Sequence, residues 1–234
     1  PAHVKLMGAL AFVLGVVATP RTSVAAFAVD AVAVAVVAAL ARLRAGEVLR
    51  RLVIEAPFVA FAVALPFVAR GPQVEVGPLT LSVDGLWSAW GILVKGTLGV
   101  AVAVVLSATT PTADLLAGAR RLRLPVALVA IAGFMVRYGD VLVGDLARLR
   151  VARISRGDDP RWLWQAKAVA ATAGSLFVRS FERGERVQLA MVSRGFDGTW
   201  PSIGQRRARP SEWVGAAAFA AVAVTGAVLA VRMG

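Results

Sequence analysis

Two copies of a Ser-Arg-Gly triplet lie in the basic part of the chain, as Ser155-Arg156-Gly157 and Ser193-Arg194-Gly195. Each triplet follows a charged segment with the periodicity of a helix. Glycine adopts the left-handed conformation that ends a helix, and an arginine in the last turn suits the negative end of the helix dipole. The repeat predicts two equivalent tips that dock on a partner. Two unrelated helix caps in an arginine-rich protein are the alternative.

The remaining residues give no sign of a catalytic or metal site. The phosphate-binding pattern Gly-x-x-x-x-Gly-Lys-[Ser/Thr] is absent, so we expect no ATP hydrolysis by this chain. The chain has no cysteine and a single histidine, His3, whereas a selective transition-metal site normally needs imidazole or thiolate ligands. We therefore predict no catalytic residue, no bound cofactor and no metal site.

Three charged residues lie inside apolar stretches, Asp30, Glu55 and Lys95. Ionisable residues within a membrane are candidates for functional sites. The structural alternative is that Asp30 faces other helices while Glu55 and Lys95 lie near the membrane interfaces.

Composition identifies the class of protein. The 234 residues are 58% hydrophobic and 17% charged, with a mean hydropathy of +0.73, whereas soluble domains are about 45–50% apolar and about 25% charged. This is typical of an integral membrane protein. The net charge of +12 fits cytoplasmic loops, lipid headgroups and protein partners, and the hydropathy argues against nucleic acid as a partner.

The order of the blocks predicts an all-α integral membrane protein with about five transmembrane helices. Residues 1–109 hold four apolar blocks, residues 110–210 form a basic cytoplasmic region with a net charge of +9, and residues 211–234 form a last span. The 41–51 loop is basic, whereas the 70–84 Gly/Pro loop has a net charge of −1. The positive-inside rule then places the N-terminus in the cytoplasm and the C-terminus outside.

The basic region contains three predicted helices, over residues 112–123, 126–155 and about 165–193. A turn is expected at residues 157–160, where the sequence is Gly-Asp-Asp-Pro. In the third helix, an apolar face includes Gly184, which we expect to let a second helix approach closely. Residues 125–143 are also apolar enough to enter the membrane, and their depth is left open.

The segment from Arg179 to Gly198 resembles the signature of the transmembrane T component of energy-coupling factor (ECF) transporters, in the CbiQ branch of cobalt uptake systems. Leu122 to Pro125 and Arg137-Tyr138, followed by residues 152–157, are similar to the preceding part of the family pattern. The apolar run that follows Val4-Lys5-Leu6 is similar to its start.

The resemblance implies a coupling role without catalysis. T components hold two cytoplasmic ABC ATPase subunits with two coupling helices, and each helix ends in an Ala-Arg-Gly-type motif. Carried onto this chain, the ATPase-docking residues are the two Ser-Arg-Gly triplets, with serine where the family usually has alanine. The planar guanidinium of each arginine suits a carboxylate or backbone carbonyls in a socket.

The resemblance also implies a CbiM-like membrane S subunit that captures the substrate, ATP bound only on the partner subunits, and a place in a bacterial inner membrane. The substrate is expected to be cobalt. A T subunit for nickel, biotin or another vitamin is one alternative. A conventional ABC permease is another, although its usual Glu-Ala-Ala…Gly coupling loop is not found. A membrane anchor without a transport role would not need two matched tips.

Overall fold

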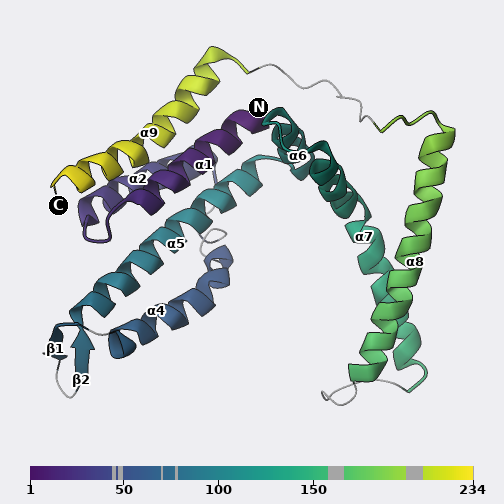
Figure 1. Ribbon diagram of the computed structural model, residues 1–234, viewed down its shortest axis with the longest axis horizontal. Helices are drawn as coiled ribbons and strands as arrows, with labels where there is room; N and C mark the ends of the chain where they lie inside the picture. The colour runs from purple at the N-terminus through teal and green to yellow at the C-terminus, as the bar shows by residue number, and fades with distance from the viewer. Residues whose placement is uncertain are drawn as a thin grey trace. The chain divides into compact units, whose positions relative to one another are not determined.

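The computed structural model describes residues 1–43, 46, 50–69, 71–76, 79–157, 166–198 and 208–233. The chain is an all-α membrane protein, as predicted (Figure 1). It divides into two compact units, one of residues 1–123 with 206–234 and one of residues 124–205. The first unit contains α1 (Ala2–Ala18), α2 (Val24–Leu40), the 3-10 turn η1 (Leu52–Glu55), α4 (Ala56–Val68), α5 (Val83–Thr109), α6 (Thr112–Arg121) and α9 (Pro210–Met233). The second contains α7 (Val126–Ile154) and α8 (Ala166–Ser193).

Among the described residues, three helices are long and apolar enough to cross a membrane, and they span Val83–Thr109, Val126–Ile154 and Pro210–Arg232. The first and third of these were predicted as spans. The other three predicted spans are shorter apolar helices, over Ala2–Ala18, Val24–Leu40 and Val53–Val68. Helix α7, which the sequence placed in the cytoplasmic region, meets the length and hydropathy criterion for a span. The location of the predicted segments 1–109, 110–210 and 211–234 relative to the membrane stays a prediction.

The 70–84 segment is more than the loop that its Gly/Pro content predicted. Residues Gln73–Val76 form β1 and Leu79–Ser82 form β2, paired antiparallel with Gln73 opposite Ser82 and Val76 opposite Leu79. The alternation of apolar and polar residues in both stretches is the period of a strand. Helix α5 starts directly after β2, where the Ser82 hydroxyl accepts a hydrogen bond from the Gly85 amide at 3.3 Å.

Helices α1 and α9 pack through small residues at matching positions. A Cβ on Gly8 would lie 3.1 Å from the Cβ of Ala216, and one on Gly15 would lie 2.9 Å from the backbone of Ala223. The earlier residue of α1, Gly8, meets the earlier residue of α9, Ala216, and the later Gly15 meets the later Ala223. The two helices therefore run in the same direction. Small residues let helix backbones approach closely in a membrane, where apolar burial does not drive helix association. This packing holds the first and last helices of the chain side by side.

The core of the first unit surrounds this pair of helices. Phe12 of α1 stacks on Phe219 of α9 with ring centroids 4.3 Å apart. The buried cluster also takes in Phe27 and Val34 of α2 and Leu98 of α5. Large apolar side chains on the outer faces of the helices remain exposed, which is the expected pattern for a surface that contacts lipid.

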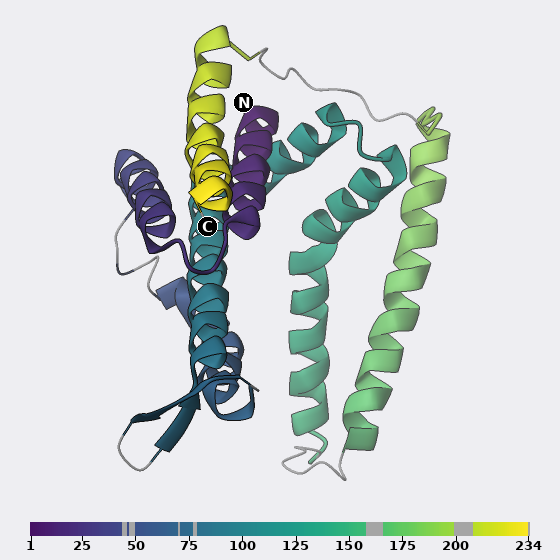
Figure 2. The ribbon, with the colours of Figure 1, turned by 60° about the vertical axis from the view of Figure 1, so that its left-hand side comes forward.

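In the second unit, α7 and α8 lie side by side and run in opposite directions (Figure 2). The predicted ends of both helices are confirmed to within one or two residues: 126–155 was expected for α7 and about 165–193 for α8. Most of the expected turn at residues 157–160 lies outside the described residues, which stop at Gly157 and resume at Ala166.

Candidate functional site: two arginine tips on a helix pair

The first Ser-Arg-Gly triplet ends α7 as a tight cap. Ser155 is the C-cap residue, and its hydroxyl donates a hydrogen bond of 3.1 Å to the carbonyl of Ala152. The Gly157 amide donates to the carbonyl of Ile154 at 2.9 Å, and Gly157 has a φ of +82°. A side chain at such a φ is strained, so glycine suits this position. The exposed Arg156 lies between these two residues.

The second triplet ends α8 with the same geometry. The Ser193 hydroxyl donates to the carbonyl three residues earlier at 3.0 Å. The Gly195 amide donates to the carbonyl of Val192 at 2.9 Å, and Gly195 has a φ of +81°. Arg194 is exposed, as its counterpart is. The two triplets therefore have the same serine bond, the same glycine conformation and an exposed arginine between them.

The two tips lie at opposite ends of the helix pair. Asp145 of α7 contacts Arg183 of α8, whereas Phe134, earlier in α7, lines the same groove as Met191, later in α8. The ion pair sets the alignment, which places Ser193 at about the level of Met135. That position is about twenty residues from Ser155, or roughly 30 Å along α7 at 1.5 Å per residue. The structure thus separates the predicted docking residues into two sites.

Asp145 makes a polar contact that joins the two helices within the described residues. Its carboxylate lies 2.9 Å from Nη2 of Arg183 and also accepts from Arg148, one turn later in α7. The Asp145 side chain is only 11% exposed, compared with 31% for Arg183 and 72% for Arg148. Ion pairs at exposed positions contribute little, so the more buried contact with Arg183 is the one that fixes the relative position of the helices.

A groove of about 720 Å³ runs between α7 and α8. Its lining includes Tyr138 and Leu142 from α7 and Gly184 and Gln188 from α8. The expectation that Gly184 allows a close helix approach is wrong, because a Cβ on this residue would meet no heavy atom within 4 Å. Gly184 follows Arg183, whose ion pair with Asp145 joins the helices, and it faces the open space of the groove.

The predicted intramembrane charges are buried or bonded in the first unit. Asp30 is completely buried, and neither of its carboxylate oxygens has a hydrogen-bond partner among the described residues. Glu55 is 7% exposed and accepts a hydrogen bond of 2.9 Å from the hydroxyl of Thr97. Lys95 donates to the carbonyl of Val17 at 2.8 Å. Glu55 and Lys95 therefore each bond α5 to another element, and among the described residues no hydrogen bond or ion pair joins the three charges.

In the part of the chain that the structure describes, no group of three or more His, Cys, Asp or Glu side chains is placed to hold a metal ion. His3 instead packs its ring against Trp213 of α9, with centroids 5.9 Å apart. This ring contact joins the start of α1 to the start of α9.

Sequence reasoning missed Asp145 and Arg183 as residues that position the tips. The sequence does mark Asp145 as unusual, because it interrupts the apolar stripe formed by Leu142, Leu146 and Leu149. A charge on a packing face needs a partner. The sequence alone gave no way to choose that partner among the arginines of α8.

Comparison with known proteins supports the family resemblance. The family described as CbiQ, cobalt transport protein, matches residues 1–205. The cobalt transport protein CbiQ of Rhodobacter capsulatus is 28% identical over 152 residues, which cover 62% of this chain and 61% of that protein.

Two archaeal relatives show similar levels of identity. A putative fused cobalt transport protein CbiMQ of Methanocorpusculum labreanum is 29% identical over 107 residues, covering 46% of this chain and 18% of that protein. An uncharacterised protein of Methanocaldococcus jannaschii is 33% identical over 110 residues, which cover 46% of this chain and 41% of that protein. The matched segments thus span less than two thirds of the length of each relative. Because the family match extends over most of the sequence, this chain belongs to the CbiQ family of cobalt transport proteins.

Proposed function

We propose that this chain is the non-catalytic T subunit of an ECF-type ABC importer for cobalt, and that it transmits motion from two cytoplasmic ATPases to a substrate-binding membrane subunit. One observation carries the proposal: two Ser-Arg-Gly caps of the same geometry lie at opposite ends of one antiparallel helix pair. Two equivalent tips about 30 Å apart along a helix suit two copies of one partner, with one socket for each tip.

The chemistry of each tip suits recognition of a carbonyl-rich or acidic socket. The positive φ of the glycine ends the helix directly after the arginine. The guanidinium therefore lies at the end of the helix. The guanidinium offers five donors in a fixed plane, which suits carboxylate or carbonyl oxygens. Truncating a charged group that is paired at an interface typically costs about 2–5 kcal/mol of binding free energy.

The helix pair acts as a lever in this proposal. A force applied by one ATPase at Arg156 passes along α7 to the contact between Asp145 and Arg183 and from there to α8. Because the tips lie at opposite ends, a change in the separation of the two ATPases changes the angle between the helices. The T subunit supplies no ligand for ATP, which is bound and hydrolysed on the ATPases.

The membrane partner that we propose is a CbiM-like S subunit. Support comes from the relative of Methanocorpusculum labreanum, whose name joins CbiM and CbiQ in one fused protein. The orientation proposed has the N-terminus in the cytoplasm of a bacterial cell and the chain in its inner membrane. The parallel packing of α1 and α9 supports it, since the basic segment that precedes α9 then lies on the same side as the N-terminus.

The test is co-purification of this chain with its ATPase subunits. Arg156→Ala and Arg194→Ala are each expected to weaken binding at one tip at least tenfold, which is about 1.4 kcal/mol, and the double variant to lose the ATPases. Arg150→Ala is the matched control, because Arg150 is exposed on α7 but lies before the tip. Normal co-purification and normal uptake by the double variant would contradict the docking role.

Uptake of labelled cobalt and nickel by cells that express the complete complex tests the substrate. Cobalt uptake that depends on the two arginines is the expected result. Arginine-dependent uptake of nickel or a vitamin alone would keep the coupling role and change the substrate. Uptake by this chain and its ATPases without a separate substrate-binding membrane subunit would favour a conventional ABC permease.

A further inference from the structure

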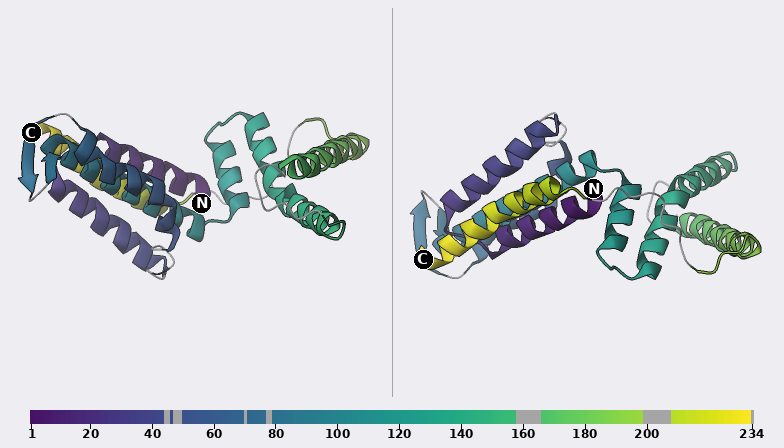
Figure 3. Two further views of the ribbon diagram at one scale, coloured as in Figure 1. Left: turned by 90° about the horizontal axis from the view of Figure 1, so that it is seen from below. Right: turned by 90° about the horizontal axis from the view of Figure 1, so that it is seen from above.

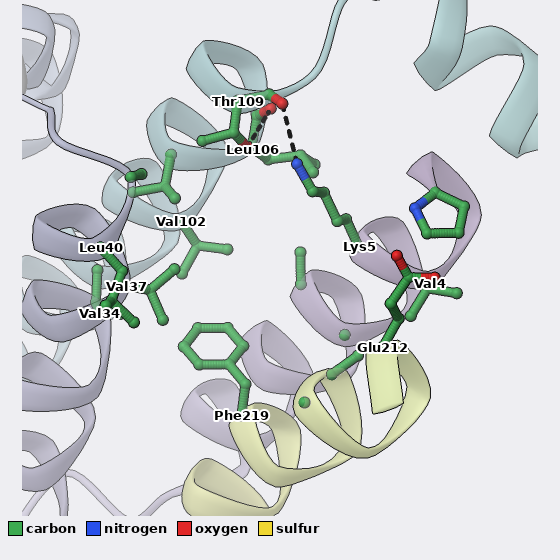
Figure 4. Close-up of a pocket in the computed structure, with 17 residues that line it drawn as sticks. Val4, Lys5, Val34, Val37, Leu40, Val102, Leu106, Thr109, Glu212 and Phe219 are labelled. Atoms are coloured by element: carbon green, nitrogen blue, oxygen red, sulfur yellow. Dashed lines mark hydrogen bonds between the residues drawn. The ribbon is translucent and has the colours of Figure 1, made fainter. Parts of the chain in front are cut away.

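A cavity of about 490 Å³ opens in the first unit between the ends of four helices (Figure 4). Most of its lining is aliphatic or aromatic and includes Val34 and Val37 of α2, Val102 of α5 and Phe219 of α9. Pockets that hold small molecules have volumes of about 300–1,000 Å³. The cavity therefore has the size and the character of a site for an apolar chain.

The cavity exists because α2 diverges from its neighbours. Helix α1 is held against α9 by the small residues at Gly8 and Gly15, and α2 packs against α9 and α5. Figure 3 shows that the end of α2 lies away from the starts of α1 and α9. Leu40, in the last turn of α2, is 79% exposed and lines the cavity. The open side of the cavity thus faces outward from the helices, where lipid lies in a membrane.

One cationic group lies at the mouth of the cavity. The Lys5 ammonium donates to the carbonyl of Thr109 at 3.0 Å (Figure 4). It also donates to the hydroxyl of Thr110 at 3.3 Å. An ammonium has three donors, and the third has no partner among the described residues. Lys5 is therefore held in place by the end of α5 and still has one N–H group for a ligand.

Lys5 and Glu212 are the charged side chains in the lining of the cavity, and Arg42 is next to the lining in sequence. Arg42 directly follows the lining residues Leu40 and Ala41 and is exposed. Glu212 also lines the cavity, and its carboxylate accepts a hydrogen bond of 2.8 Å from the backbone amide of Arg209. The Glu212 carboxylate is therefore already bonded at the start of α9, whereas Lys5 keeps one N–H group for an anion. Basic pockets between helices on the cytoplasmic side of a membrane bind anionic headgroups.

We propose that this cavity binds one molecule of phosphatidylglycerol. An acyl chain lies among the valines and Phe219, and a phosphate oxygen accepts a hydrogen bond from the free N–H of Lys5. The remaining N–H of Lys5 and the exposed Arg42 next to the lining favour phosphatidylglycerol, which has no cation of its own, over phosphatidylethanolamine, whose ammonium group they would repel. The bound lipid fills the gap between α2 and α1 and thereby supports the end of the unit that carries α6.

The experiment is native mass spectrometry of the full chain, purified in mild detergent with the subunits that accompany it, after addition of phosphatidylglycerol or phosphatidylethanolamine. The wild-type chain is expected to retain one phosphatidylglycerol. Lys5→Glu should lower its retention at least tenfold, whereas Lys5→Arg should keep it. Lys167→Glu is the charge-matched control, because Lys167 is an exposed lysine on α8.

Gly215→Leu tests the apolar part of the site without touching Lys5. A Cβ on Gly215 meets no heavy atom within 4 Å, and leucine favours the helix, so the variant should fold and fill part of the cavity. A tenfold loss of retention is again expected. No retained lipid in the wild type, equal retention by the wild type and both cavity variants, or equal retention of phosphatidylethanolamine would overturn the proposal.

Discussion

Arg183 of α8 donates to Asp145 of α7 across 2.9 Å, and this ion pair joins the two helices that carry the arginine tips. The Asp145 side chain is nearly buried, so its partner cannot be removed without leaving a charge in a poorly solvated place. The pair therefore sets where the two helices cross and, through that, where each tip lies.

Arg183→Met is expected to loosen the helix pair, because it leaves Asp145 with only the exposed Arg148 as partner. We expect a loss of about 1–3 kcal/mol in the stability of the helix pair, the usual cost of a buried acceptor that loses a donor. The measurement is the distance distribution between spin labels at Ser155→Cys and Ser193→Cys, in a chain that has no cysteine of its own. The distribution should broaden in the Arg183→Met background.

Arg148→Met is the matched control for this prediction, since Arg148 binds the same carboxylate but is 72% exposed. Surface pairs contribute about 0–1 kcal/mol, so the label distribution should stay as narrow as in the parent. Equal broadening by both variants would show that the contact between α7 and α8 does not depend on the buried pair.

The glycines that end α7 and α8 should not tolerate a side chain. Gly157→Ala and Gly195→Ala each place a Cβ at a φ near +80°, which costs about 1–2 kcal/mol. If the cap orients the arginine, ATPase binding at that tip weakens about five- to thirtyfold. Titration of the ATPase against the purified chain, by fluorescence or calorimetry, measures this change.

Gly174→Ala provides the comparison within α8. A Cβ there meets no heavy atom within 4 Å and the residue lies inside the helix, where alanine is more stable than glycine by about 0.5–1 kcal/mol. ATPase binding should be unchanged. Unchanged binding by the two cap variants as well would mean that the left-handed glycines are structural ends without a role in docking.

The contact between α1 and α9 should be sensitive to a single added carbon. Gly15→Ala would bring a Cβ to 2.9 Å from backbone atoms of Ala223 and Val224, and a backbone cannot move aside as a flexible side chain can. Overpacking of this kind costs about 1–3 kcal/mol. The melting temperature of the purified chain should fall by several degrees, as followed by tryptophan fluorescence.

Gly99→Ala is the corresponding control in α5, since its Cβ meets nothing within 4 Å. The melting temperature should remain the same or rise. A fall of equal size in both variants would attribute the effect to the helices in general and not to the packing between α1 and α9.

Structural features that depend on residues close together in the sequence could be predicted from the sequence. The apolar composition determines that the chain is a membrane protein, and Pro125, Gly157 and Gly195 bound the two long helices at nearly the predicted positions. The two tips were predicted because a cap depends on three or four consecutive residues. The β-hairpin at residues 73–82 also had a local signal, which the Gly/Pro content of the segment obscured.

The tertiary structure alone decided which distant residues meet. Gly8 and Gly15 could have faced any helix, and only the fold places them on Ala216 and Ala223. The opposite positions of the two tips and the pairing of Asp145 with Arg183 depend on how α7 and α8 align. Periodicity gives the face that a helix buries but not its partner, because many helices in this chain present similar apolar faces and the choice among them rests on close fit between specific side chains.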